Sequence, residues 1–252
     1  PNKTYIGYDI PGALAERAAL PAEALCPVTD DVSDAEAAAM QPLASAQLTV
    51  EEASIDPGDV VAVVGTGVMG YQCAQLAALQ GAGRVIVTDV DPEKLAIAED
   101  RGLTAVNAAE TDPVERILTA TDGIGADVVF EAVGGTQSDA TGGREPLAQA
   151  FAAARPGGRV VQVGYIIGEV SLSPRRLRSK SVDWINPTTG VTAYTPNATT
   201  GEHVAELVAD DRVSITEYVT HELDGLERFA DAIDITMNKA EHGARGPAQL
   251  VL

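Results

Sequence analysis

Three closely spaced glycines have the pattern of a phosphate-binding turn. Gly65, Gly67 and Gly70 follow the apolar, β-branched run 60–64 and precede a stretch with helical spacing. Between a strand and a helix, this pattern places the pyrophosphate of a dinucleotide against backbone N–H groups at the helix N-terminus. The first glycine permits the tight turn, the second lets the backbone approach the pyrophosphate, and the third permits close helix–strand packing. The pattern alone is weak evidence, so its surroundings decide its value.

An acidic residue strengthens this interpretation. Asp89 ends the next apolar run, 19 residues after Gly70, close to the spacing of about 20 residues expected for a ribose-binding acid. Its carboxylate is expected to accept hydrogen bonds from the adenosine ribose and to repel a 2′-phosphate, which favours NAD over NADP. The alternative is a turn or N-cap role for Asp89. Asp91, directly before Pro92, is the better N-cap and leaves Asp89 for the ribose.

The elements around these residues alternate in type. Strands are expected at 60–64, 84–89, around 106, 127–134, 159–164 and 182–185, and helices at 70–79, 91–101, 114–120 and 147–154. Strictly alternating strands and helices predict an α/β fold with a doubly wound parallel Rossmann sheet. The later glycines Gly134 and Gly164 end strands, where such a sheet opens toward its ligand. They could equally be turn glycines.

Both ends of the chain depart from this alternation. We expect a short strand within 14–20, a helix over 34–40 with Ser33 and Glu36 as its capping box, and a second helix over 43–53 after Pro42. Toward the C-terminus, we expect helices over 202–209 and 225–237 and strands over 215–219 and 249–252. The C-terminal elements therefore predict a second, smaller unit.

Charge and composition narrow the class of protein. The formal net charge is −20, with 4 Lys and 13 Arg, which makes nucleic acid and anionic membranes poor partners. A general acidic protein and one adapted to a salt-rich (halophilic) cytoplasm are both consistent with this charge; the second is favoured, because salt screens self-repulsion. Cys26 and Cys73 cannot close a four-ligand zinc site and fit a reducing, cytoplasmic compartment. The basic cluster 174–180 is read as a solvated stretch or interface, with contact to an anionic cofactor or an acidic partner subunit as a weaker alternative.

Together the motifs resemble the medium-chain dehydrogenases/reductases, specifically their zinc-type alcohol and polyol branch. The resemblance runs over nearly the whole chain. The segments that carry it are 12–16 (GALAE), 27–42 with AAAMQP at 37–42, 56–65 (DPGDVVAVVG), 130–134 (FEAVG), 156–164 (PGGRVVQVG) and the closing strand–helix–strand at 218–252. Asp89 and Lys94 match the acid and lysine that the family places around the ribose, and the nicotinamide is expected near 163–165. The residues predicted to contact the cofactor are Gly65, Gly67, Val68, Met69, Gly70, Asp89, Lys94, Val133, Gly134, Val163, Gly164 and Tyr165.

The resemblance also implies an organisation and an activity. A Rossmann domain, 45–190, is expected between 1–44 and 191–252, which form a partial GroES-like catalytic domain. The family takes its catalytic zinc from early cysteine, histidine and glutamate ligands. Here only Gln41 remains, where polyol-type members carry Glu, and an amide is a poor zinc ligand. We therefore predict no metal ligand in this chain, with zinc only from sequence outside it.

Three functions follow from the resemblance. The first is an NAD-dependent oxidoreductase acting on the hydroxyl of a small alcohol, polyol or sugar. The second is a non-catalytic NAD-binding subunit, and the third, weaker, is a zinc-independent reductase that would usually prefer NADPH. A dimer or tetramer is expected, through edge-strand pairing at 182–185. No catalytic residue is assigned: His203, His221 and His242 lie at unrelated points, and Cys73 is expected to be a packing residue.

Overall fold

The computed structural model describes residues 6–137, 144–187 and 197–252. The chain divides into two compact units, one formed by 1–45 with 188–252 and the other by 46–187. The predicted limits 1–44, 45–190 and 191–252, and the assignment of the outer segments to a GroES-like domain, stay predictions.

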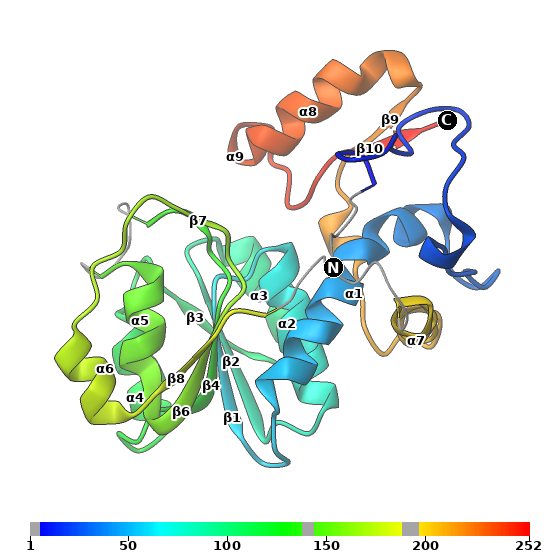
Figure 1. Ribbon diagram of the computed structural model, residues 1–252. Coiled ribbons are helices and arrows are strands. Elements are labelled where there is room, and N and C mark those ends of the chain that lie inside the picture. The colour runs from blue at the N-terminus through cyan, green and yellow to red at the C-terminus, as the bar shows by residue number, and fades with distance from the viewer. Residues whose placement is uncertain (1–5, 138–143, 188–196) are drawn as a thin grey trace. The chain divides into compact units, whose positions relative to one another are not determined.

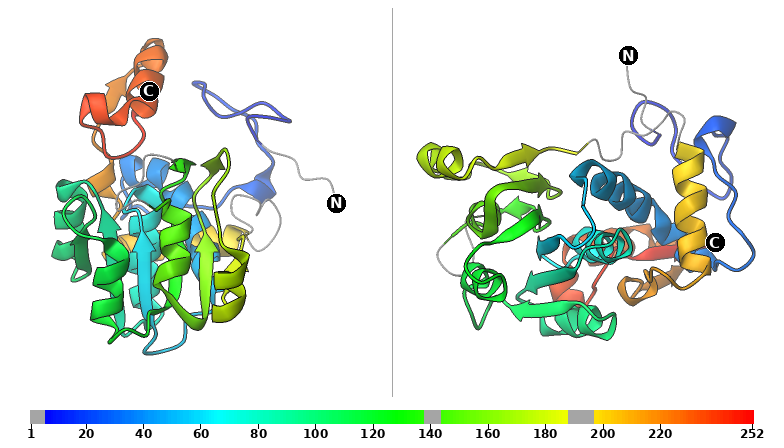
Figure 2. Two further views of the ribbon diagram at one scale, coloured as in Figure 1. Left: turned by 90° about the vertical axis from the view of Figure 1, so that its left-hand side faces the viewer. Right: turned by 90° about the horizontal axis from the view of Figure 1, so that it is seen from below.

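The unit 46–187 is built on a six-stranded parallel sheet with the strand order β3-β2-β1-β4-β6-β8. These strands are β1 (Val60–Val64), β2 (Arg84–Asp89), β3 (Thr104–Asn107), β4 (Ala126–Glu131), β6 (Ala154–Gln162) and β8 (Asp183–Ile185). Figure 2 shows their arrows pointing the same way. Val63 and Phe130 on the central strands are fully buried, which explains why these strands read as continuous apolar runs. The predicted doubly wound α/β sheet is confirmed.

Helices lie on both faces of this sheet (Figure 1). They are α2 (Val68–Leu79), α3 (Pro92–Asp100), α4 (Pro113–Ala120), α5 (Pro146–Ala153) and α6 (Pro174–Lys180). The last four begin with proline, whose fixed φ suits the first helical position. The side chain of Asp91 accepts a hydrogen bond from the Glu93 N–H at 3.0 Å, so its predicted N-cap role is confirmed. A short pair, β5 (Gly135–Thr136) and β7 (Ile166–Ile167), completes the unit.

The helix α1 (Asp34–Ala53) corrects one prediction. It is a single helix of 20 residues with Pro42 inside it, and not two helices separated there. Proline removes one backbone hydrogen bond, but the alanine-rich residues on both sides favour helix, and Leu43 and Val50 are fully buried. The capping box is confirmed, since the Ser33 N–H donates to the Glu36 carboxylate at 2.9 Å and the Glu36 N–H donates to Ser33 Oγ at 3.3 Å.

The other unit contains helices α7 (Asn197–Ala209), α8 (Phe229–Met237) and α9 (Lys239–His242), and a parallel pair, β9 (Glu222–Asp224) and β10 (Gln249–Val251). The strand predicted within 14–20 is wrong: this exposed segment has no regular structure, since alanine and glutamate have weak β-propensity. The strand predicted at 215–219 is also wrong. A 3₁₀ turn, Thr216–Tyr218, stands there, and Ile215 and Tyr218 are buried three residues apart, the 3₁₀ period.

Across the described residues, the helices are too short or too polar to cross a bilayer.

Candidate functional site

The turn that follows β1 explains its three glycines. Gly65 has a φ of +94°, and a Cβ there would lie 2.9 Å from the Val133 backbone nitrogen. A Cβ on Gly70 would lie 1.9 Å from the Gly65 carbonyl oxygen, so the helix start packs directly on the turn. Gly67 differs, because nothing lies within 4 Å of the position of its Cβ. Open space therefore lies over Gly67 and over the uncapped N-terminus of α2, where backbone N–H groups can bind an anion.

Asp89 takes part in the same turn. Its Oδ2 accepts a hydrogen bond from the Thr66 N–H at 2.7 Å, and its Oδ1 accepts from the N–H groups of Val90 and Asp91 at 2.8 and 3.0 Å. The carboxylate thus organises its turn, as the alternative interpretation held. It is only partly buried, and a carboxylate has about four acceptor positions, which leaves capacity for a ribose hydroxyl. Lys94 lies 3.3 Å from the Asp91 carboxylate.

A cavity of about 370 Å³ opens beside this turn. It brings together five of the residues predicted to contact the cofactor: Gly65, Gly67, Asp89, Lys94 and Val133. Its other lining residues are Val64, Thr88, Val90, Ala108, Ala132, Thr136, Gln137, Pro146 and Gln149. Most of these residues lie at or just after the carboxyl ends of β1, β2, β3 and β4, where parallel sheets bind their ligands. Lys94 comes from α3, and Pro146 and Gln149 come from α5.

Seven predicted residues do not line this cavity. Val68 and Met69 lie half-buried in the first turn of α2, and Gly70 is buried beneath the turn. The other four, Gly134, Val163, Gly164 and Tyr165, form a cluster after β4 and β6.

In that cluster, Gly164 packs closely on the loop that follows β4, the strand beside β6. A Cβ on Gly164 would lie 2.5 Å from the Gly134 nitrogen. The Gly135 N–H donates to the Tyr165 carbonyl at 2.7 Å, and the Tyr165 side chain is 86% exposed.

Glu131, the last residue of β4, was not among the predicted site residues. Its fully buried Oε1 accepts hydrogen bonds from the N–H groups of Val133 and Gly134 at 3.0 and 3.1 Å, and from Gln137 Nε2 at 3.0 Å. Gln137 Oε1 in turn accepts from the Leu147 N–H, at the start of α5, at 2.9 Å. This network connects two walls of the cavity. The available signal was an acid ending an apolar strand, as at Asp89.

No zinc site can be built from the residues that the structure describes. Among them, no three His, Cys, Asp or Glu side chains are grouped so as to hold a metal ion. Gln41 Nε2 donates to Ser45 Oγ at 3.0 Å. His221 pairs with Thr220 and His242 with Asp234, at 3.0 and 2.9 Å.

The Cys73 thiol is fully buried in α2, and burial raises its pKa to about 12. A thiol with this pKa stays protonated at neutral pH and is not a nucleophile, in agreement with its expected packing role.

Comparisons with known proteins identify dehydrogenases and reductases as relatives of this chain. The model of the family described as zinc-binding dehydrogenase matches residues 65–209. D-xylulose reductase A of Aspergillus oryzae is 30% identical over 232 residues, which cover 89% of this chain and 59% of that protein. The chain spans about half the length of the curated relatives it matches.

Solved structures agree with these relatives. Alcohol dehydrogenase TADH from Thermus sp. ATN1 has a TM-score of 0.78 at 26% identity, covering 96% of this chain and 68% of that one. A structure from Sinorhizobium meliloti 1021 with bound NADP has a TM-score of 0.75 at 26% identity, covering 90% and 64%.

Proposed function

Because the chain belongs to the zinc-binding dehydrogenase family, we propose that it is the NAD-binding part of an oxidoreductase acting on an alcohol, polyol or sugar hydroxyl. The observation that carries this proposal is the cavity lined by Gly67 and Asp89. It combines a helix N-terminus open to an anion with a carboxylate open to a hydroxyl. Relatives named D-xylulose reductase and sorbitol dehydrogenase support the substrate class.

The residues of the turn have separate roles in this proposal. Gly65, Gly67 and the first N–H groups of α2 would hold the pyrophosphate, because Gly67 leaves room for it. The ribose hydroxyls donate to Asp89, whose orientation is held by the Thr66 N–H at 2.7 Å. Val133 and residues 163–165 would hold the nicotinamide, which would supply hydride-transfer chemistry when the cofactor is bound.

Asp89 supports NAD over NADP. A 2′-phosphate would bring up to two negative charges next to this carboxylate. At a separation of about 5 Å and an effective dielectric constant of about 20, each would cost roughly 3 kcal/mol. Lys94 offsets only part of this cost, because its ammonium also lies 3.3 Å from the Asp91 carboxylate. The similar structure from Sinorhizobium meliloti contains NADP, so the affinities of this chain for NAD and NADP need to be compared directly.

The zinc and its ligands would come from sequence outside this chain. The described residues do not fit a zinc ion, and Gln41, the one position suggested by the resemblance, carries an amide bonded to Ser45. The same observation favours a second candidate function, a non-catalytic NAD-binding subunit.

The proposal extends to the environment and assembly of the protein. Its net charge of −20 supports a salt-rich cytoplasm, since dissolved ions screen repulsion between surface carboxylates. We further propose a homo-oligomer, with no nucleic acid or membrane partner.

Calorimetric titration with NAD and NADP tests the cofactor. The proposal requires saturable NAD binding that is at least about tenfold tighter than NADP binding, and it fails if neither nucleotide binds or if NADP binds better. NADH formation from a panel of alcohols, polyols and sugars, measured with zinc and with the sequence that supplies the zinc ligands, then separates the two functions. NAD binding without turnover under these conditions supports the non-catalytic subunit.

A further inference from the structure

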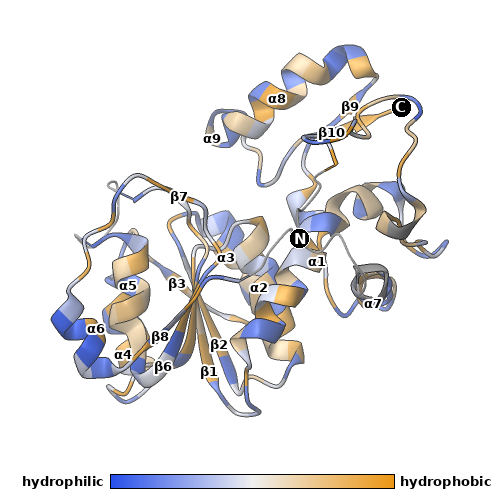
Figure 3. Cartoon of the chain, viewed as in Figure 1, coloured by the Kyte–Doolittle hydropathy of each residue, from blue (hydrophilic) through white to orange (hydrophobic). Residues whose placement is uncertain are grey.

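The helix α6 is strongly basic, although the chain as a whole is acidic. Residues 174–180 carry four of the chain's 17 Lys and Arg residues and no Asp or Glu. Figure 3 shows α6 as strongly hydrophilic. The rest of the chain has 13 basic and 37 acidic residues, a charge of −24. This helix borders a cavity.

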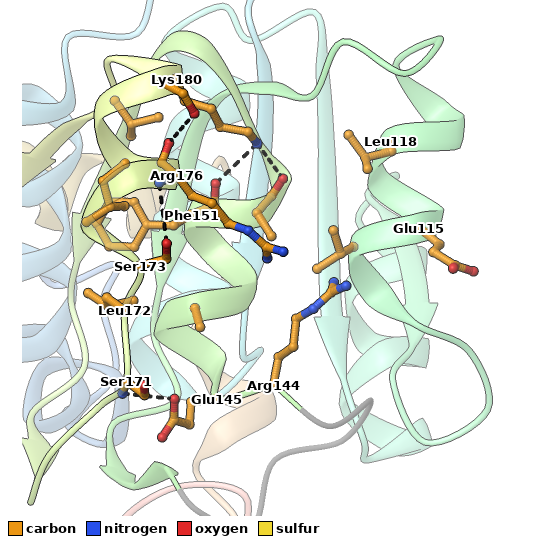
Figure 4. A pocket seen from close by; sticks show the side chains of 16 residues that line it. Glu115, Leu118, Arg144, Glu145, Phe151, Ser171, Leu172, Ser173, Arg176 and Lys180 are labelled. Atoms are coloured by element: carbon orange, nitrogen blue, oxygen red, sulfur yellow. Dashed lines mark hydrogen bonds between the residues drawn. The ribbon is translucent and has the colours of Figure 1, made fainter.

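This cavity of about 800 Å³ lies between α4, α5 and α6 (Figure 4). Much of its wall is apolar, formed by Val114, Leu118, Phe151, Leu172, Leu177 and Val182. Apolar walls with a few polar groups are typical of small-molecule sites, and the volume lies within their usual range of about 300–1,000 Å³.

Two guanidinium groups point into this cavity. Arg144 precedes α5 and Arg176 lies on α6, and both side chains extend into the gap beside α4 (Figure 4). Within the described parts of the chain, the Arg176 guanidinium makes no hydrogen bond or ion pair. Arg144 lies 3.7 Å from Asp112 and its side chain is 44% exposed, so this pair neutralises it only weakly.

The remaining charged groups of the cavity are already used or turned away. Glu145 accepts a hydrogen bond from the Ser171 N–H at 3.1 Å, and Glu115 points away from the two arginines (Figure 4). Lys180 Nζ donates to the carbonyls of Ala152 and Ala154, both at 2.7 Å, so it satisfies the C-terminal end of α5. The lining therefore carries three basic and two acidic side chains, and among the described residues no carboxylate pairs with the Arg176 guanidinium beside the apolar wall.

We propose that this cleft binds an organic anion with an apolar body. The body would cover Phe151 and Leu172, and the carboxylate or phosphate head would lie between Arg144 and Arg176, where forked N–H groups suit either head. The site is separate from the nucleotide cavity. Ala148 and Phe151 line this cleft, whereas Pro146 and Gln149, on the other side of α5, line the nucleotide cavity.

A tryptophan close to this cleft allows ligand binding to be followed by fluorescence. Its single tryptophan, Trp184, packs edge-on against Phe151, with ring centroids 5.4 Å apart. We would titrate the full chain with octanoate and octyl phosphate, following Trp184 emission and, in parallel, calorimetry. Octanol tests the apolar body without an anionic head, and inorganic phosphate tests the anionic head without an apolar body. All titrations would be run at constant ionic strength with saturating NAD, which keeps the probes out of the nucleotide cavity.

Saturable binding of octanoate or octyl phosphate is expected, at least about tenfold tighter than binding of octanol or inorganic phosphate, and the tighter of the two identifies the head group. Arg176→Gln and Arg144→Gln should each weaken binding about tenfold, because each removes a charge-assisted hydrogen bond. Arg178→Gln, on the same helix but outside the cleft, is the matched control and should leave affinity unchanged. The proposal is overturned if neither anion binds with NAD present, if octanol binds equally well, or if Arg178→Gln acts like Arg176→Gln.

Discussion

Replacing Gly67 and Gly70 one at a time by alanine should separate cofactor binding from folding. A Cβ on Gly70 would lie 1.9 Å from the Gly65 carbonyl oxygen, whereas ordinary contact begins near 3.4 Å, so one backbone segment must move by 3.4 − 1.9 = 1.5 Å. Overpacking of this kind costs about 3 kcal/mol or more. For a chain of this size, that loss lowers the Tm by roughly 6–12 °C.

Gly67→Ala should behave differently. Its Cβ would meet nothing within 4 Å, and its φ of −71° suits alanine. The loss of an N-cap glycine should cost less than about 1 kcal/mol. The methyl group would, however, occupy the space assigned to the pyrophosphate. We expect NAD affinity to fall at least tenfold, or about 1.4 kcal/mol.

Thermal unfolding followed by circular dichroism, with calorimetric NAD titration, measures both effects. Native-like NAD binding by Gly67→Ala would place the pyrophosphate elsewhere. A native-like Tm for Gly70→Ala would refute the packing argument.

Three further outcomes are expected. Asp89→Asn should raise the ratio of NADP to NAD affinity at least tenfold. It should also cost about 1–2 kcal/mol of stability, because an amide cannot accept all three backbone hydrogen bonds. An unchanged affinity ratio in paired titrations would show that Asp89 does not select between the two cofactors. For Asp127, burial raises the pKa, but hydrogen bonds from Arg155 and the Val60 N–H, together with the charges of Arg155 and Arg159, outweigh this effect and hold the pKa below the ordinary value. The resulting stabilisation is present above the unfolded-state pKa of about 4 and is lost as the pH falls through the folded-state pKa. Urea unfolding should thus show Asp127→Asn less stable than the native chain at pH 7, and the difference should shrink at pH 3; a constant difference would contradict this assignment. Raising KCl from 0.1 to 2 M should raise the Tm by several degrees, because the net charge of −20 repels itself less; a falling Tm would argue against salt adaptation.

Local chemistry explains the features that could be predicted from sequence. The apolar runs, the glycine turn after β1 and the cap at Asp91 depend on residues near one another in the chain, and each was predicted within a few residues of its place. The resemblance to a dehydrogenase family rested on the same motifs in the same order, and the match over residues 65–209 confirmed it. Where local signals were ambiguous, the predictions were wrong: Pro42 lies inside a helix, and Thr216–Tyr218 forms a 3₁₀ turn.

Only the tertiary structure determined which distant residues meet. Asp89 reads as a strand-ending acid, but the Thr66 N–H, 23 positions earlier, binds its carboxylate because β1 and β2 lie side by side. Gln137 carries no motif, yet it connects Glu131 to the start of α5. Arg144 and Arg176 face one cavity although they are far apart in the sequence. Strand order and helix packing bring such residues together, so spacing along the chain determined the turn, and the assembled sheet determined its surroundings.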